Sequence, residues 1–208
     1  MIPQQISAGL LLLFLAAGTV TTHAATRIWT GAVSPFWSNP ANWLHGQRPL
    51  PGDSIEFPEE APIREVYNDL ELDFSVGDIT IKGRNYILQG NRISLEGDLT
   101  SMPSNSTNRI MLDAHLYAPL TISNHGYFNQ LELGGHLRLW YDPLVLETSS
   151  SIKITNYLMD TNNLGVIQRG AGTVSFEGNG FLVGAMIVET GDLLLSGSPN
   201  RMRIVGGP

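Results

Sequence analysis

An alternating acidic stretch is the first candidate for chemistry in this chain. From Asn68 to Phe74 the sequence reads NDLELDF, so Asp69, Glu71 and Asp73 alternate with other residues. In an extended strand, residues two apart share a face and lie about 6.5–7 Å apart. A row of carboxylates could bind Ca²⁺, and a pair could hydrolyse a glycoside. We expect instead a solvated outer face, because catalytic carboxylates usually come from different strands and line a cleft.

A second candidate is a cluster of tryptophans. Trp29, Trp37 and Trp43 fall within fifteen residues, in a segment too broken by Pro and Gly to form a helix. Exposed indole rings could stack on sugars, whereas buried rings would add a large apolar area to a core. We expect burial, because Gly52-Asp53 and an apolar strand follow directly. Each buried indole N–H would then need an acceptor such as a loop carbonyl.

The other residue types argue against further chemistry. The chain has no cysteine, which excludes disulfides, thiol nucleophiles and thiolate metal ligands. No zinc-site spacing joins the histidines at positions 45, 115, 125 and 136. A Gly-x-Ser-x-Gly nucleophile motif is also absent. The sequence therefore predicts no catalytic residue, no metal and no cofactor, and we expect the protein not to be an enzyme.

Composition narrows the class of protein. The 208 residues are 42% hydrophobic and only 15% charged, with 22 glycines, which is typical of an all-β extracellular protein. The net charge is −7 and there is no basic run. Nucleic acid is therefore not an expected partner, since phosphate binding needs clustered Lys and Arg.

The N-terminus has the pattern of a secretory signal peptide. Residues 7–20 form an uncharged apolar run, and Thr22 and Ala24 are small residues suited to the positions before a cleavage site. We expect cleavage after Ala24 and a secreted or cell-surface protein, exported across the inner membrane. The run is short for a membrane span, which needs about 20 apolar residues. An uncleaved anchor is the alternative, because residues 1–5 contain no Lys or Arg.

Short apolar triplets recur after residue 25. Six of them begin 17, 21, 21, 22 and 19 residues apart: Ile93–Leu95, Ile110–Leu112, Leu131–Leu133, Ile152–Ile154, Val174–Phe176 and Leu193–Leu195. A second, less regular set is Ile79–Ile81, Leu120–Ile122, Leu137–Leu139 and Ile187–Glu189. A period near 20 predicts an all-β, parallel β-solenoid (β-helix), whose stacked coils bury one continuous core.

An antiparallel β-sandwich is the alternative, since it also has short strands at a spacing of about 8–12 residues. The near-regular step favours the solenoid. In each triplet the two outer residues would face the core and the middle one the solvent. Glycines at the corners would supply positive φ: Gly77, Gly90, Gly97 and Gly191. The open end of the first coil needs a cover, and the Trp-rich segment is expected to provide it.

Two segments carry motifs of a recognisable kind. Residues 27–57 combine spaced tryptophans with Asn42-Trp43, Gly52-Asp53 and the strand Ile55–Phe57. Residues 170–197 contain a Gly-x-Gly-Thr strand, a Gly-Asn corner and a Gly-x-Leu strand. These segments resemble secreted proteins with autotransporter-associated β-strand repeats. The resemblance implies a right-handed β-solenoid in an exported or surface protein.

Together these patterns predict three regions and a function. The regions are a signal peptide at 1–24, a Trp/Pro-rich N-terminal cap at 25–58 and solenoid coils at 59–208. The last coil has no capping segment after it, so we expect the chain to be part of a longer gene product. The predicted function is a non-catalytic exported scaffold, a surface-display or adhesin-like passenger segment.

Two alternatives stay open at this stage. A polysaccharide-degrading β-helix enzyme would need polar residues that converge in a groove. A carbohydrate-binding protein would need accessible tryptophans. The partner would be an extracellular polysaccharide or a cell-surface glycan, and a membrane would be met only through export or a missing C-terminal anchor. The oligomeric state is not predicted.

Overall fold

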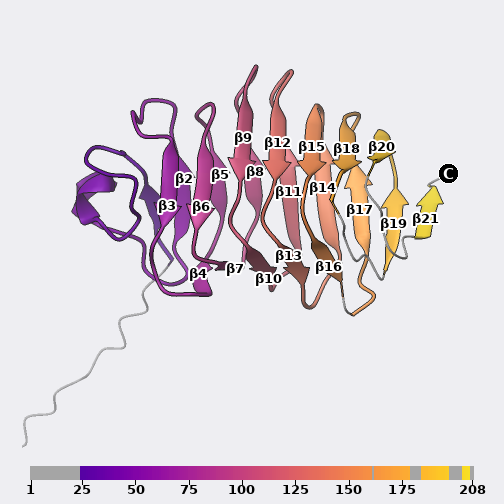
Figure 1. Ribbon diagram of the computed structural model, residues 1–208, viewed down its shortest axis with the longest axis horizontal. Helices are drawn as coiled ribbons and strands as arrows, with labels where there is room; N and C mark the ends of the chain where they lie inside the picture. Colours follow the sequence, from indigo (N-terminus) through magenta and orange to yellow (C-terminus); the bar gives the residue numbers. More distant parts are fainter. Residues whose placement is uncertain (1–23, 161, 179–183, 197–202, 207–208) are drawn as a thin grey trace, which may run out of the picture.

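The computed structural model describes residues 24–160, 162–178, 184–196 and 203–206, which wind into a β-solenoid (Figure 1). Residues 1–23, which hold most of the predicted signal peptide, lie outside the described residues. Among the residues that are described, no helix has the length and apolar character needed to cross a membrane.

Three sheets form the walls of the solenoid. The nine-stranded sheet contains, in spatial order, β1 (Thr26–Ile28), β2 (Ser54–Phe57), β5 (Ile79–Ile81), β8 (Leu99–Ser101), β11 (Leu120–Asn124), β14 (Leu144–Thr148), β17 (Val166–Arg169), β19 (Ala185–Val188) and β21 (Arg203–Gly206). The seven-stranded sheet contains β3 (Glu65–Asn68), β6 (Ile87–Gly90), β9 (Thr107–Ile110), β12 (Gln130–Leu133), β15 (Ser151–Ile154), β18 (Thr173–Phe176) and β20 (Asp192–Leu195). The five-stranded sheet contains β4 (Phe74–Val76), β7 (Ile93–Leu95), β10 (Ala114–Leu116), β13 (Leu137–Leu139) and β16 (Leu158–Asp160).

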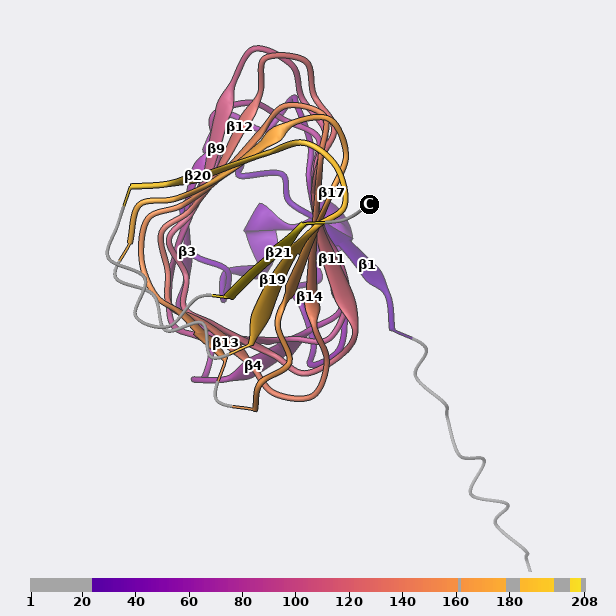
Figure 2. The same cartoon turned by 90° about the vertical axis from the view of Figure 1, so that its right-hand side faces the viewer.

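Each full coil adds one strand to each wall, as β5, β6 and β7 do before β8 starts the next coil. Paired residues in neighbouring coils are between 18 (Met186 to Ile204) and 24 (Ile55 to Ile79) positions apart. Seen from the C-terminal end, the chain turns counter-clockwise as it advances toward the viewer, so the coil is right-handed (Figure 2). Neighbouring strands pair in parallel throughout the described chain, so the sandwich alternative is wrong.

Burial follows the period of two that the triplets predicted. Leu131 and Leu133 are buried, while Glu132 between them faces outward. The triplet at Ile110 was placed wrongly, because Ile110 pairs with Leu133 and the residue opposite Leu131 is Asn108. Because the polar Asn108 occupies a core position, the apolar triplet was assigned two residues too late. The triplet Ile93–Leu95 belongs to the five-stranded sheet, whereas the others of its series lie in the seven-stranded one.

Asn108 belongs to a buried hydrogen-bond network at the corner between the nine- and seven-stranded sheets. Ser101 Oγ accepts from Asn108 Nδ2 and from Asn129 Nδ2, both at 3.1 Å. Asn129 Nδ2 also donates to Asn124 Oδ1, and Asn124 Nδ2 donates to the Ser151 carbonyl at 2.6 Å. Because buried polar groups must be satisfied, this network fixes how successive coils stack.

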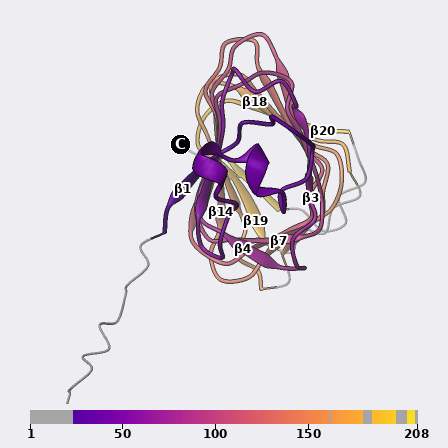
Figure 3. The ribbon, with the colours of Figure 1, turned by 90° about the vertical axis from the view of Figure 1, so that its left-hand side faces the viewer.

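The Trp-rich segment covers the N-terminal end of the first coil. Two 3₁₀ turns, η1 (Pro40–Asn42) and η2 (Leu44–Gly46), lie across that end (Figure 3). Trp43 packs edge-on against Trp29 and Trp37, with ring centroids 5.1 and 6.2 Å apart. Phe57 of β2 lies beneath both of those rings. β2 (Ser54–Phe57), at the end of the predicted cap, pairs in parallel with β5 and so belongs to the nine-stranded sheet.

Candidate functional site

The three tryptophans of the first segment do not form a surface. Trp29, Trp37 and Trp43 are 0%, 0% and 2% exposed, so none offers a ring face to a sugar. Trp29 Nε1 donates to the Ile63 carbonyl at 2.9 Å, and Trp43 Nε1 donates to the Trp37 carbonyl at 2.8 Å. Trp37 Nε1 is buried and has no acceptor among the described residues. The indoles therefore act as a plug over the core.

The acidic stretch is a corner, not a strand. The strand β3 ends at Asn68, whose side-chain oxygen accepts from the Leu70 N–H at 3.1 Å and so turns the chain. Leu72 is 66% exposed and Asp73 has a φ of 60°, so the predicted alternation of faces is wrong. An asparagine that bonds its own backbone outweighed the alternating pattern here.

The three acidic side chains do not gather. Asp69 accepts hydrogen bonds from Ser38, Glu71 is exposed, and Asp73 pairs with Arg92. Within the part of the chain that the structure describes, no group of three or more acid or histidine side chains is placed to hold a metal ion. The row of carboxylates that could have bound Ca²⁺ is therefore not assembled among the described residues.

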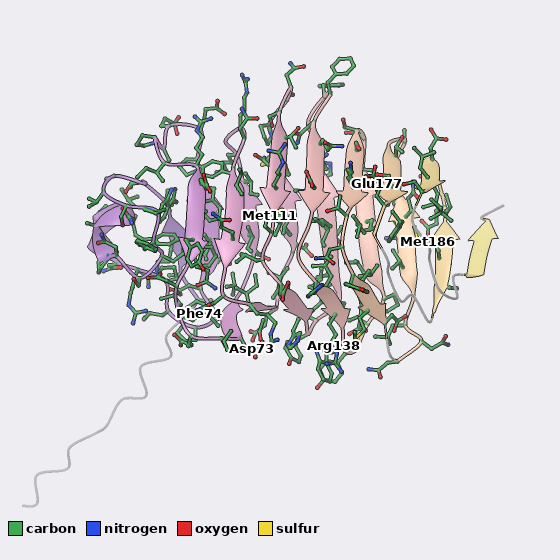
Figure 4. The ribbon with its side chains drawn as sticks, viewed as in Figure 1. Asp73, Phe74, Met111, Arg138, Glu177 and Met186 are labelled. Carbon is green, nitrogen blue, oxygen red and sulfur yellow. The ribbon has the colours of Figure 1, made fainter. Side chains whose placement is uncertain are left out.

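The outer face of the five-stranded sheet is where chemically capable residues do converge. The strands present their middle residues outward in one register: Ser75, Ser94, His115, Arg138 and Met159. The residues just before the strands form a second row: Asp73, Arg92, Asp113, His136 and Tyr157. Residues just after three of the strands add a third row: Glu96, Tyr117 and Trp140. These rows are called the outer face below, and Asp73 and Arg138 mark the same side of the solenoid in Figure 4.

An aromatic stack lies in the middle of the outer face. The rings of Tyr117 and Trp140 are stacked, with centroids 5.6 Å apart and planes 10° from parallel. The Arg138 guanidinium lies 4.1 Å from the Trp140 ring centroid, a close cation–π contact. His115 meets the Trp140 ring edge-on at 5.8 Å, and the 65% exposed Tyr141 lies 6.1 Å from Tyr117. Contacts on several sides hold the stack in place.

A charged pair joins the stack to the first coil. The Asp73 carboxylate accepts two hydrogen bonds from Arg92, Nε at 2.6 Å and Nη2 at 2.8 Å, and this pairing lowers the pKa of Asp73. His115 Nδ1 lies 3.2 Å from Asp73 Oδ1. Burial is the main cause of a lowered pKa of His115, and the positive charge of Arg92 adds to it. His115 is therefore neutral at pH 7.

Some hydrogen-bond donors on the outer face lack a partner. Arg138 Nε and Trp140 Nε1 are buried atoms without an acceptor among the described residues. On the same face, His136 Nδ1 lies 3.4 Å from Asp113 Oδ2.

Two adjacent hollows open on the outer face. One, of about 350 Å³, is lined by Arg92, Asp113, His115, His136, Leu137, Arg138, Tyr157 and Met159. The other, of about 640 Å³, is lined by Asp73, Ser75, Ser94, Glu96, Tyr117 and Ala118. They adjoin because Asp73 of the second contacts Arg92 and His115 of the first.

The period of two along the apolar triplets was a signal for this site. The triplet Leu137–Leu139 places Arg138 outward by the period of two, and Ala114–Leu116 does the same for His115. Comparison of the chain with protein-family models, with curated proteins and with solved structures found no match.

Proposed function

We propose that this protein is an exported, non-catalytic β-solenoid scaffold that binds a polysaccharide along its outer face. The observation that carries the proposal is the stack of Tyr117, Trp140 and Arg138 beside two adjacent hollows. The buried tryptophans of the cap have no part in it.

The shape of the outer face suits a linear polymer. Five strands follow one another along the solenoid at about 4.8 Å each, so the rows extend for about 19 Å. A single small molecule would fill one hollow, whereas a chain of several sugars would lie along both. Partners that repeat along an axis match a surface that repeats along the same axis.

The chemistry of the outer face also suits sugars. A sugar ring has an apolar face of C–H groups and a rim of hydroxyls that donate and accept hydrogen bonds. Tyr117 and Tyr141 offer aromatic surface for the apolar face. The Arg138 guanidinium carries hydrogen-bond donors, and Glu96 supplies an exposed carboxylate acceptor. Ligand sites commonly combine aromatic walls with a few such polar groups.

The test is glycan binding by the exported protein, measured by calorimetry after a panel of polysaccharides has identified a ligand. Tyr117→Ala and Arg138→Gln should each weaken binding at least about tenfold, the equivalent of about 1.4 kcal/mol. Tyr127→Ala is the matched control, because Tyr127 is an exposed tyrosine (79%) on a distant loop. A panel without a ligand, or binding that survives both outer-face substitutions, would overturn the proposal.

A second candidate function is cleavage of an acidic polysaccharide by His115. It is favoured by the neutral state of His115 between Asp73 and two arginines. An arginine could neutralise a uronate carboxylate while His115 removes the proton on the adjacent carbon. The glycosidic C–O bond would then break to leave a carbon–carbon double bond, with a proton passing to the departing oxygen.

Cleavage is tested by the ultraviolet absorbance of unsaturated products during incubation with uronate polymers. His115→Gln should abolish that signal and leave binding intact. Binding without any unsaturated product would leave the scaffold function alone.

A further inference from the structure

Ala25, the residue after the predicted cleavage position, is held by a nearly buried carboxylate. Its backbone N–H donates to Asp53 Oδ1 at 2.8 Å, and its carbonyl accepts from the Ser54 N–H at 2.9 Å. The strand β1 begins one residue later, at Thr26. Ala24, by contrast, is exposed. The boundary between an exposed chain and an anchored one therefore lies between Ala24 and Ala25.

The Asp53 side chain is built to be an anion. It is 4% exposed, and its Oδ2 accepts from Arg27 Nε at 2.6 Å and from the Leu50 N–H at 3.0 Å. Burial alone would raise the pKa of Asp53, but the hydrogen bonds from Leu50, Ala25 and Arg27 lower it overall. Asp53 therefore carries its charge at neutral pH and links β1 to the segment that leads into β2.

We propose that Asp53 is the binding site for the α-ammonium group of Ala25 once the leader has been removed. The inference rests on the export processing of the proposed function and is independent of sugar binding. Hydrolysis adds water across the Ala24–Ala25 peptide bond and leaves a carboxylate on Ala24 and an amine on Ala25. That amine is protonated near neutral pH, since its ordinary pKa is about 7.7–8.0.

Cleavage changes the charge of this contact without moving the nitrogen. A hydrogen bond in which only the carboxylate is charged becomes an ion pair between Ala25 and Asp53, and the attraction between two opposite charges is added to it. The gain holds β1 against β2 at the edge of the nine-stranded sheet. Removal of the leader therefore tightens the cap as soon as the chain has been exported.

The ion pair has a pH signature of known sign. Its partner raises the pKa of the α-ammonium group above the unfolded value of about 7.7–8.0. The added stability is complete below that value and is lost as the pH rises through the folded pKa. The nearby charges that take part are those of Asp53 and Arg27.

The experiment uses the exported protein produced from the full-length gene. Its intact mass gives the first residue, which should be Ala25. The α-amino group is then acetylated in denaturant near pH 6.5, where its ordinary pKa of about 7.7–8.0 leaves it more reactive than Lys82 and Lys153, and the protein is refolded. Acetylation should lower the melting temperature by about 2–4 °C at pH 6.5, and the difference should shrink toward pH 9.5.

Asp53→Asn is the matched variant, in which acetylation should leave the melting temperature unchanged. If that variant does not fold, the pH dependence of the difference in the wild-type protein decides. An exported chain that begins at another residue would overturn the proposal. So would a chain that begins at Ala25 and melts at the same temperature before and after acetylation.

Discussion

At the scale of single residues, the three buried tryptophans differ in the fate of the indole N–H. Those of Trp29 and Trp43 reach carbonyl oxygens, while that of Trp37 is buried without an acceptor. Replacing any of them with Phe removes apolar volume. Only at positions 29 and 43 does it also strip a carbonyl of its donor. Trp37→Phe should therefore be less destabilising than Trp43→Phe by about 1–2 kcal/mol, as measured by guanidinium unfolding. An equal or larger loss for Trp37→Phe would contradict this assignment of hydrogen bonds.

His115 predicts a loss of stability in mild acid. Its folded pKa lies below the ordinary 6.5, so the unfolded chain binds the proton more readily. Stability is therefore unaffected above pH 6.5 and falls as the pH drops from 6.5 through the folded pKa. The charges that face His115 are those of Asp73, Arg92, Asp113 and Arg138. Between pH 7.5 and pH 5, the melting temperature of the wild type should fall by more than that of His115→Gln. The difference between the two proteins at neutral pH should therefore shrink. Parallel curves would count against the shift.

The Asp73–Arg92 pair belongs to a lower pH range. The lowered pKa of Asp73 means that its contribution is present above the ordinary value of 3.8 and is lost as the pH falls through the folded value. Because both side chains are more than a third exposed, solvent screening keeps this contribution small. Asp73 therefore contributes little to any loss of stability above pH 4.

Two asparagines show where prediction from the sequence pattern failed. Alternation at Asn68–Phe74 predicted a strand, yet the Asn68 side chain bonds the Leu70 N–H and turns the chain. Asn108 occupies a core position that the pattern assigned to an apolar residue. Both asparagines bond to backbone or to other buried polar groups. The bonds of Asn108 depend on residues of other strands, which a local pattern does not contain, whereas the Asn68–Leu70 bond is local and the alternation of apolar residues concealed it.

At the scale of the elements, close contact between coils depends on glycine. A Cβ on Gly135, just before β13, would lie 1.8 Å from the Leu112 carbonyl oxygen of the coil beneath. Gly135→Ala should push the two coils apart and cost about 2–4 kcal/mol. Gly46→Ala is the control, because nothing lies within 4 Å of a Cβ there and only its positive φ is strained. That strain is worth about 1–2 kcal/mol. Urea unfolding measures both, and equal costs would argue against tight stacking at Gly135.

Most strands could be predicted from the sequence. The reason why glycine stands at the corners between them could be predicted only in part. Gly90 and Gly191 have the positive φ that a turn between strands was expected to need. Gly77 and Gly97 do not. A Cβ on Gly97 would meet Asp78 Oδ1 at 2.3 Å and the Gly77 backbone at 2.9 Å. Those glycines are required by the distance between coils, which has no signature along a single strand.

At the scale of the whole molecule, the burial of the walls is uneven along the axis. In β15, the inward-facing Ile152 and Ile154 are 0% and 1% exposed, whereas in β20 Leu193 is only partly buried and Leu195, in the same register as Ile154, is 38% exposed. Because each coil is held by its neighbours, local opening costs least where a wall is least covered. Hydrogen exchange followed by mass spectrometry should show slow exchange in β12 and β15 and much faster exchange in β20. Uniform protection along the axis would contradict this gradient.

The outer face is a property of the whole molecule, and this limits what sequence can say of it. The pattern of apolar triplets correctly turned Arg138 outward. It could not show that Arg138 would lie over the Trp140 ring, or that Tyr117 would stack on that same ring. The Tyr117–Trp140 contact joins residues 23 positions apart in neighbouring coils, and coil lengths vary from 18 to 24. An error of two positions in the alignment of the coils, as at Ile110, is enough to separate these residues in a prediction from sequence.

The parallel register also bears on how a gene of this kind can change. Ala114 and Leu137 occupy the same place in successive coils, so recombination that copies residues 114–136 joins ends that already match. Such a duplication lengthens each row of the outer face by one residue, and a deletion between the same points shortens each row by one. The other coils keep their register. A lineage can thus lengthen or shorten the outer face, one coil at a time, without a new core.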